Sequence, residues 1–191
     1  MIKEFAKEYL ADLKTSIDRL PLDKLEEIVE LLRGACQNGE RIYVMGNGGS
    51  AATASHFVCD FAKGCNVKGK KKFKVISLTD NVPMLTALGN DISYDDIFTG
   101  QLEPLLEKDD LVIAFTGSGN SKNILKAVEY ANSVGAVTIA LTGFDGGKVK
   151  GLAKTCLVVP SDNMERIEDL HLIIEHLIHL YLLKEIKGSE Q

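Results

Sequence analysis

The sequence predicts an α/β protein, a three-layer αβα sandwich around a parallel sheet of about five strands. Short apolar runs rich in β-branched residues recur after residue 40, and helical or glycine-rich segments separate them. Continuous apolar strands that alternate with helices indicate a parallel sheet that is buried on both faces. We therefore expect the flavodoxin-like strand order 2-1-3-4-5.

The N-terminal residues predict a pair of helices ahead of this sheet. Apolar side chains recur at helical spacing over residues 2–20 and 22–38. Pro21 separates the two segments, and Gly39 stands where the second helix would end. The 191 residues fit a single domain, with the helical pair at 1–38 and the αβα core at 40–191.

Five apolar runs supply the expected strands, and one long helix follows them. The runs read "RIYVM", "FKVISL", "DLVIAF", "AVTIAL" and "TCLVVP". Residues 164–186 predict the last helix, in which "LHLIIEHLIHLYLL" is apolar over much of its surface. A helix this apolar is buried, either in the core or against another subunit.

The composition excludes several classes of protein. The chain carries 27 acidic and 22 basic residues, and this formal net charge of −5 argues against a nucleic-acid-binding surface. We interpret the basic run at residues 68–74 as a solvated loop rather than as an anion site. No apolar run reaches the roughly 18–20 residues of a membrane span. Charges such as Lys3 and Glu4 argue against a signal peptide, and the four cysteines lack metal-site spacing, so we expect a cytoplasmic protein with reduced thiols.

Two glycine-rich turns are the main candidates for a binding site. "GNGGS" (residues 46–50) and "TGSGNS" (116–121) each follow an expected strand and lead into a helix. Free backbone N–H groups at such helix starts favour an anion. Hydroxyls that can bind phosphate oxygens come from Ser50, Thr116, Ser118 and Ser121.

Each turn alone could equally be a tight connection with a serine N-cap. Two of them, on strands that should be neighbours, favour a bound phosphate monoester, because ligands of open α/β sheets lie beyond the carboxyl ends of the strands. Neither turn has a nucleotide-binding pattern, so we expect no nucleotide cofactor.

These turns carry a resemblance that extends over most of the chain. The segments "GNGGSAATASHF", "LGNDISYDDIF", "GSGNS", "ALTGFDGGK" and "ERIEDLHLIIEH" resemble the sugar-isomerase (SIS) domain family, in particular its phosphoheptose isomerase branch. The resemblance implies a homotetramer with active sites at subunit interfaces. It also implies the interconversion of a ketose phosphate and an aldose phosphate, here sedoheptulose 7-phosphate and a heptose 7-phosphate.

The resemblance also implies roles for particular residues. Asp60 would be the catalytic base and His176 its partner. Some members bind zinc at the positions that correspond here to His56, Asp60, Glu168 and His176. The residues that would contact the sugar or its phosphate are Asn47, Gly48, Gly49, Ser50, Asn90, Asp91, Thr116, Gly117, Ser118, Ser121 and Glu168.

The residue chemistry agrees with such a reaction. Ketose–aldose isomerisation passes through an enediolate and needs a base near the carbon and an acid near the oxygen. His56 and Asp60 are four residues apart and share a helix face, and Glu168 and His176 are eight apart, about two turns. The same four side chains offer nitrogen and oxygen ligands for a divalent metal such as zinc. We interpret the remaining two histidines, His171 and His179, as core residues.

Four positions depart from the family pattern. Asp60 stands where a glutamate is usual, Glu168 replaces a glutamine, the arginine after the base is missing from "DFAKGC", and the second turn reads Thr-Gly-Ser instead of Ser-Thr-Ser. These departures leave three alternatives open. They are an isomerase for another sugar phosphate such as arabinose 5-phosphate, a sugar-phosphate sensor without turnover, and a non-catalytic scaffold that binds the bacterial replication initiator.

Overall fold

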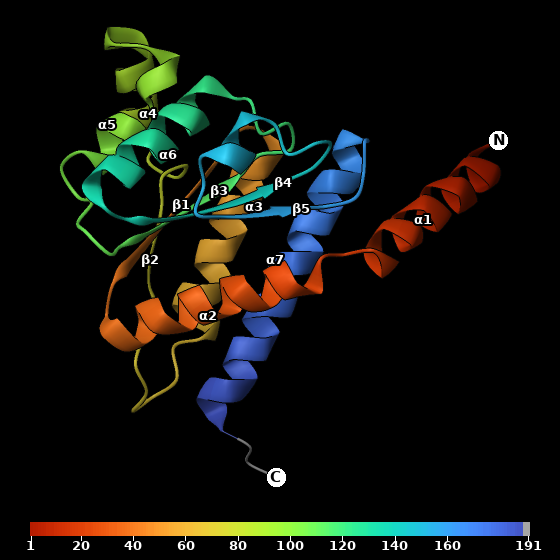
Figure 1. The fold of residues 1–191 in the computed structure, drawn as a ribbon, viewed down its shortest axis with the longest axis horizontal. Coiled ribbons are helices and arrows are strands. Elements are labelled where there is room, and N and C mark those ends of the chain that lie inside the picture. Colours follow the sequence, from red (N-terminus) through yellow and green to blue (C-terminus); the bar gives the residue numbers. More distant parts are fainter. Residues whose placement is uncertain (189–191) are drawn as a thin grey trace.

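The sheet has the predicted strand order. The structure, a computed structural model that describes residues 1–188, contains five parallel strands in the order β2-β1-β3-β4-β5 (Figure 1). The strands are β1 (Arg41–Gly46), β2 (Lys74–Ser77), β3 (Leu111–Phe115), β4 (Val137–Thr142) and β5 (Thr155–Val158). Each lies within or overlaps one of the five apolar runs, so both the number of strands and their order are confirmed.

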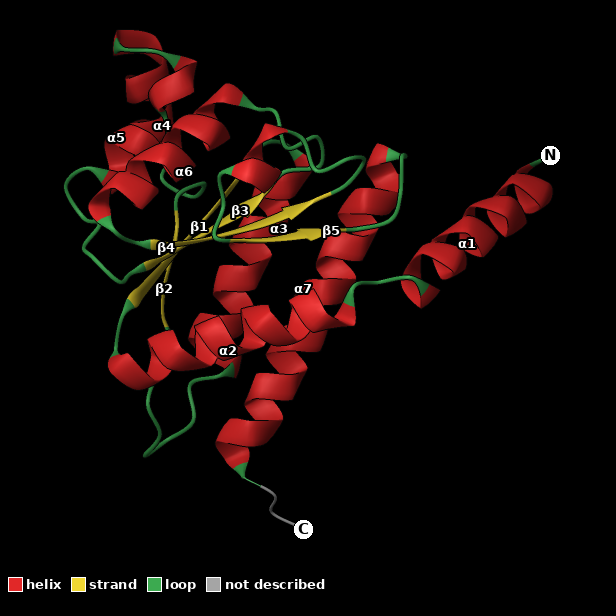
Figure 2. Ribbon diagram, viewed as in Figure 1, coloured by secondary structure: helices red, strands yellow, loops and turns green. Residues whose placement is uncertain are grey.

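Helices cover both faces of the sheet, as Figure 2 shows. One face packs against α2 (Leu22–Asn38), α3 (Gly49–Cys59) and α7 (Met164–Lys187), and the other against α4 (Val82–Asp91), α5 (Thr99–Leu102) and α6 (Lys122–Val134). A hydrophobic core lies on each face of the sheet. Successive residues of a strand pack into opposite cores, because side chains alternate between the two faces. Val44 belongs to the core beneath α3 and α7, whereas Met45 belongs to the core beneath α6.

Three short helical segments connect these elements. They are the π-helix η1 (Asp60–Gly64) and the 3₁₀ helices η2 (Tyr94–Asp96) and η3 (Lys148–Gly151). The first continues directly from α3 and begins at a residue of the candidate site. Short π-helical turns are frequent at functional sites.

The two N-terminal helices have different roles. α2 is part of the sandwich, whereas α1 (Ile2–Asp18) extends away from it (Figure 1). Near α7, the Tyr9 hydroxyl donates a hydrogen bond to Asp169 Oδ2 at 2.5 Å. On the same helix, the side chains of Phe5 and Leu10 are 63% and 62% exposed. Exposed large apolar side chains such as these are available to another protein chain.

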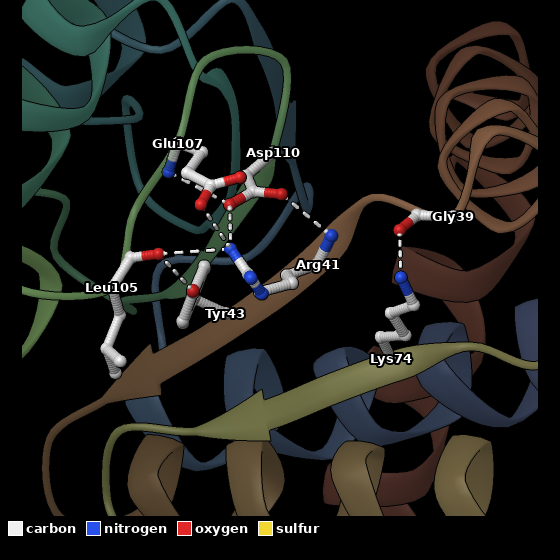
Figure 3. A network of polar contacts seen from close by, with 7 residues as sticks. All are labelled: Gly39, Arg41, Tyr43, Lys74, Leu105, Glu107 and Asp110. Atoms are coloured by element: carbon white, nitrogen blue, oxygen red, sulfur yellow. Dashed lines mark hydrogen bonds and ion pairs between the residues drawn. The ribbon is translucent and has the colours of Figure 1, made fainter.

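A polar network fixes the beginning of β1 (Figure 3). The Asp110 carboxylate accepts hydrogen bonds from the backbone N–H groups of Arg41, at 2.8 Å, and Glu107, at 3.0 Å. The Leu105 carbonyl accepts from the Tyr43 hydroxyl at 2.9 Å and from the Arg41 guanidinium at 3.3 Å. These contacts hold the amino ends of β1 and β3 together, at the edge of the sheet opposite the glycine-rich turns.

Two lysines of the basic run cap the end of α2. The ammonium of Lys71 donates to the Gln37 carbonyl. The ammonium of Lys74 donates to the Gly39 carbonyl at 2.5 Å, as Figure 3 shows. Cations near the last carbonyls of a helix satisfy free acceptors and complement the helix dipole. This part of the run therefore has a structural role.

None of the helices in the described part of the chain is long and apolar enough to cross a membrane. All four cysteines, which lie at positions 36, 59, 65 and 156, are free thiols. The last helix, predicted at 164–186, spans Met164–Lys187 and buries one side against the sheet.

Candidate active site

The two glycine-rich turns lie side by side at the carboxyl ends of neighbouring strands. β1 pairs in parallel with β3, and Gly46 at the end of β1 stands opposite Phe115 at the end of β3. The first turn leads into α3 and the second into α6. The N-termini of α3 and α6 therefore point toward the same end of the sheet. Their free N–H groups and positive dipole ends favour the binding of an anion there.

Side chains link the two turns directly. Asn47 and Asn123 exchange two hydrogen bonds between their side-chain amides, each 2.9 Å long. The Tyr94 hydroxyl donates to Asn47 Oδ1 at 3.0 Å. Asn47, Gly48 and Tyr94 line a cavity together with Thr79. Asn123 and Tyr94 were not among the residues expected from the sequence, because they lie 76 and 47 positions from Asn47 and only the folded chain brings them together.

The second turn is held against a neighbouring loop. Gly119 has a φ of +65°, and a Cβ atom at this position would collide with the carbonyl oxygen of Gly146. Both its left-handed conformation and this close approach require glycine. The backbone N–H of Gly143 also donates to the Gly117 carbonyl at 2.9 Å. The path of the turn is therefore determined by the loop after β4.

The expected phosphate hydroxyls differ in accessibility. Ser118 and Ser121 are half-buried and accessible from solvent, whereas Ser50 and Thr116 are buried. Ser118 Oγ accepts a hydrogen bond from the Asn120 backbone N–H at 3.3 Å, an arrangement typical of a serine turn. The two accessible serines are thus the hydroxyls that a phosphate can reach in one subunit.

Asn90 and Asp91 lie outside the cavity next to Asn47. Both are exposed at the end of α4, where Asn90 Nδ2 donates to Asp91 Oδ1 at 2.8 Å. Gly89, one residue earlier, does line the cavity. The two side chains therefore face solvent in the single chain.

A second group of polar side chains gathers at the far end of α3, where this helix lies beside α7. His56 Nε2 is 3.3 Å from His176 Nε2 and 3.6 Å from Asp60 Oδ2. His176 Nε2 also lies 3.9 Å from Asp60 Oδ2 and 3.4 Å from Glu175 Oε2. One ligand atom from each of these four residues lies within 4.8 Å of the others. The structure thus brings together both predicted catalytic residues.

Glu168 lies elsewhere, although the resemblance includes it among the metal ligands. A Cβ atom at Gly49 would collide with the Glu168 carboxylate, so this carboxylate sits against the start of α3. It is eight residues before His176 on α7, about 12 Å along the helix. Burial, with smaller contributions from Glu165 and Asp169, raises the pKa of Glu168.

Glu175 takes the fourth place in the group near Asp60. Its side chain is fully buried, and neither carboxylate oxygen has a hydrogen-bond partner among the described residues. Burial first, and the nearby charge of Asp60 second, raise the pKa of Glu175 to about 8. A glutamate within "LIIEHLI", on a helix expected to be buried, is the sequence signal that could have indicated it.

His179 also approaches Asp60, whereas His171 is enclosed in the core. His179 Nδ1 lies 3.5 Å from Asp60 Oδ2, and its ring is 5.8 Å from that of Phe61. The prediction of a core histidine holds for His171, which is 1% exposed and lies 5.9 Å from the Phe115 ring. Three imidazoles therefore surround the Asp60 carboxylate.

His171 makes the stability of the fold depend on pH. Burial lowers the pKa of His171 to about 4, and the backbone of Thr142 opposes this shift to a smaller extent. Between pH 4 and 6.5 the unfolded chain binds a proton at this residue and the folded chain does not. The free energy of unfolding therefore falls by up to roughly 3 kcal/mol as the pH drops through this window. Above the window, the contribution of His171 to stability is fully present.

We expect His171→Leu to remove this part of the pH dependence. Urea unfolding of the wild type and the variant between pH 4 and 7 measures it. Equal pH slopes for the two proteins would show that His171 does not titrate in this way.

The fold and the two turns define the class of protein. A parallel αβα sandwich with paired phosphate-type turns at adjacent strand ends, and with a histidine–carboxylate group nearby, has the architecture of SIS proteins. The family model of the SIS domain matches residues 5–143.

The branch of this family follows from the relatives. The chain is 40% identical to a phosphoheptose isomerase of Helicobacter pylori (strain P12) over 175 residues, which cover 90% of each chain. It is 39% identical to a probable phosphoheptose isomerase of Thermoplasma acidophilum, over 91% of this chain and 94% of that one. The chain belongs to the SIS domain family and, within it, to the phosphoheptose isomerases.

A solved structure supports this membership. A phosphoheptose isomerase from Francisella tularensis matches with a TM-score of 0.89 and 29% identity, over 97% of this chain and 99% of that one. The agreement includes almost the whole length of both chains. The chain is accordingly an enzyme of the sugar-phosphate isomerase class.

Proposed function

We propose that this enzyme interconverts sedoheptulose 7-phosphate and a heptose 7-phosphate through an enediolate. The observation that carries the proposal is the convergence of Asp60 and His176, from two different helices, at 3.9 Å. His56, beside them, stands seven residues or about 10 Å along α3 from Gly49 in the phosphate-type turn. This span suits an extended seven-carbon sugar phosphate.

The phosphate binds between the two glycine-rich turns. The accessible hydroxyls of Ser118 and Ser121 donate to its oxygens, and the N-termini of α3 and α6 supply backbone N–H groups and positive dipole ends. Asn47, held by Asn123, lies between the turns and contacts the sugar. Thr116, Ser50 and the glycines of the two turns shape this cradle.

The proton moves at the other end of the site. Asp60 removes a proton from C1 of the ketose, next to the C2 carbonyl, while His176 protonates the C2 oxygen to give the enediol. Asp60 then returns a proton to C2 while His176 accepts the proton of the C1 hydroxyl, which leaves the C1 aldehyde of the aldose. The contacts of Asp60 with the imidazoles all use Oδ2, which leaves Oδ1 for the substrate. His179 Nδ1, 3.5 Å from the same Oδ2, helps to hold the short aspartate side chain in place.

We include one divalent metal ion, such as zinc, in the proposal. The donors fit it, because two imidazoles and two carboxylates meet within 4.8 Å and the buried Glu175 carboxylate lacks a hydrogen-bond partner among the described residues. The chemistry that such an ion would supply here is polarisation of the substrate carbonyl, and His176 would then serve to hold the ion. In both cases Asp60 moves the proton at carbon.

One assay tests the reaction and its sugar together. The protein is incubated in D₂O with a panel of five- to seven-carbon ketose and aldose phosphates, and interconversion is followed by NMR. We expect turnover of sedoheptulose 7-phosphate with solvent deuterium incorporated at C2. Turnover restricted to arabinose 5-phosphate and its ketose would reassign the substrate. Binding without turnover would indicate a sensor, and the lack of both would favour a scaffold.

We also propose a homotetramer whose active sites lie at subunit interfaces. The projecting α1 with its exposed Phe5 and Leu10 supports association with other copies of the chain. Asn90 and Asp91 are exposed outside the cavity of one subunit, which suits a site that a neighbouring subunit completes.

Charges in place of the exposed apolar side chains of α1 should disrupt this assembly. We expect the double variant Phe5→Glu, Leu10→Glu to lower the molar mass measured by light scattering below four times 20.8 kDa, and to lose activity with it. Lys7→Glu is the control for the added charge, since it places a glutamate on α1 without removing an exposed apolar side chain. If the double variant and the control have the same mass, α1 is not the contact surface.

A further inference from the structure

The orientation of the Asn47 side-chain amide is set by its neighbours. The backbone N–H of Ile124, which can only donate, gives its hydrogen bond to Asn123 Oδ1 at 2.9 Å. This contact fixes the orientation of Asn123, whose Nδ2 must then donate to the acceptor end of Asn47, Oδ1, at 2.9 Å. Asn47 Nδ2 donates back to Asn123 Oδ1 at the same distance. A backbone group in the first turn of α6 therefore determines which end of the Asn47 amide carries the oxygen.

Tyr94 adds a second donor to the same oxygen. Its hydroxyl donates to Asn47 Oδ1 at 3.0 Å, so this oxygen accepts two hydrogen bonds and both of its lone pairs are used. One N–H of Asn47 is taken by Asn123, and the other N–H takes no part in these hydrogen bonds. Asn47 is half-buried and lines the same cavity as Tyr94. In this orientation the amide can offer a ligand a donor but no acceptor.

Ion pairs hold Tyr94 in place. Tyr94 begins η2, and the two residues after it pair with lysines of α6: Asp95 with Lys122, at 4.0 Å, and Asp96 with Lys126. Tyr94 itself is 61% exposed, so its position depends on such polar contacts more than on burial. All of these contacts lie within one subunit, and the arrangement therefore forms without a neighbouring copy.

We propose that Tyr94 is a positioning residue, which keeps the Asn47 amide turned so that its free N–H meets an oxygen acceptor of the substrate. The inference rests on the proposed function, which places Asn47 against the sugar phosphate. Such a ligand offers acceptors in its phosphate and hydroxyl oxygens. A reversed amide would instead present its own oxygen to a substrate oxygen, and the hydrogen bond would be lost. The Tyr94 hydroxyl opposes this reversal.

Tyr94→Phe removes the hydroxyl and keeps the ring. We expect the KM for sedoheptulose 7-phosphate to rise about 3- to 10-fold, the usual effect of one hydrogen bond. We expect kcat to stay within about twofold of the wild type, because the contact binds substrate and transition state alike. Tyr130→Phe is the control for the loss of a tyrosine hydroxyl, since Tyr130 lies on α6 outside the lining of this cavity, and it should leave both constants unchanged.

A double-mutant cycle separates this positioning role from a general structural one. Asn47→Ala has no amide to orient, so the further change Tyr94→Phe should alter kcat/KM by less than about twofold, against about 3- to 10-fold in the wild type. Calorimetry gives the same cycle for the dissociation constant of sedoheptulose 7-phosphate when every protein also carries Asp60→Asn to stop turnover. Asn47→Asp keeps the shape but has only acceptor oxygens, and should weaken binding by at least about tenfold.

Two outcomes would overturn the proposal: equal effects of Tyr94→Phe with and without the Asn47 amide, or wild-type affinity in Asn47→Asp. Circular dichroism checks that each variant is folded. Binding that shows the coupling in a protein without turnover would contradict the proposed reaction and leave the role of Tyr94 intact. Turnover without the coupling would do the reverse, and a wild type that does not bind sedoheptulose 7-phosphate would overturn both.

Discussion

Replacement of Asp60 by asparagine should lower kcat for sugar-phosphate interconversion by about 100- to 10,000-fold, the usual contribution of a positioned general base. Asparagine has nearly the same shape but cannot accept the proton from carbon. Asp60 is partly exposed and begins the π-helix η1, so the substitution leaves the core intact. His176→Gln should give a loss of similar size in the metal-free enzyme, because it removes the group that protonates the carbonyl oxygen.

Binding and folding controls accompany these variants. Both should still bind a phosphorylated ligand, because Ser118 and Ser121 of the phosphate-type turn are unchanged. Glu129→Gln, an exposed carboxylate on α6, controls for the loss of a negative charge and should retain activity. Wild-type turnover in either Asp60→Asn or His176→Gln would show that the residue does not have the role assigned to it.

The second large effect is expected at Gly119. In Gly119→Ala the new Cβ would collide with the backbone oxygen of Gly146, and a φ of +65° is unfavourable for alanine. Backbone cannot move aside as a flexible side chain can, so the turn must shift away from the loop after β4. We expect a destabilisation of about 1–3 kcal/mol. We also expect kcat/KM to fall by at least about tenfold, because hydrogen bonds to the phosphate are lost.

Gly151→Ala is the matched control for this substitution. Gly151 ends η3 in the same part of the molecule, and a Cβ atom there would meet no other atom within 4 Å. Thermal unfolding and steady-state kinetics on both variants provide the comparison. If Gly119→Ala behaves like Gly151→Ala, the second turn does not need its tight path for binding.

The sequence was sufficient to predict the architecture. Each strand is a short apolar run that has to be buried on both sides, and this requirement leaves few alternatives to a parallel sheet with helices on both faces. The end of the second helix was equally readable, because Gly39 adopts the left-handed conformation that ends α2. The strand order was predicted from about five apolar strands that alternate with helices, and it placed the two turns on neighbouring strands, as the pairing of β1 with β3 confirms.

The details of the site were less predictable, because they depend on contacts between distant segments. Spacing correctly placed His56 and Asp60 on one side of the continuous helix that α3 and η1 form, where 3.6 Å separates His56 Nε2 from Asp60 Oδ2. Spacing alone could not indicate that Glu168 rests against Gly49, which lies 119 positions earlier in the chain. Nor could it distinguish Glu175 from the apolar residues around it until α7 was seen beside α3.

The most direct test of the account is a crystal structure of Asp60→Asn with bound sedoheptulose 7-phosphate. We expect the phosphate oxygens to lie about 2.7–3.0 Å from the hydroxyls of Ser118 and Ser121. The C1–C2 end of the sugar should lie beside residue 60 and His176. A phosphate bound away from both glycine-rich turns, or a sugar bound in the reverse direction, would contradict the account.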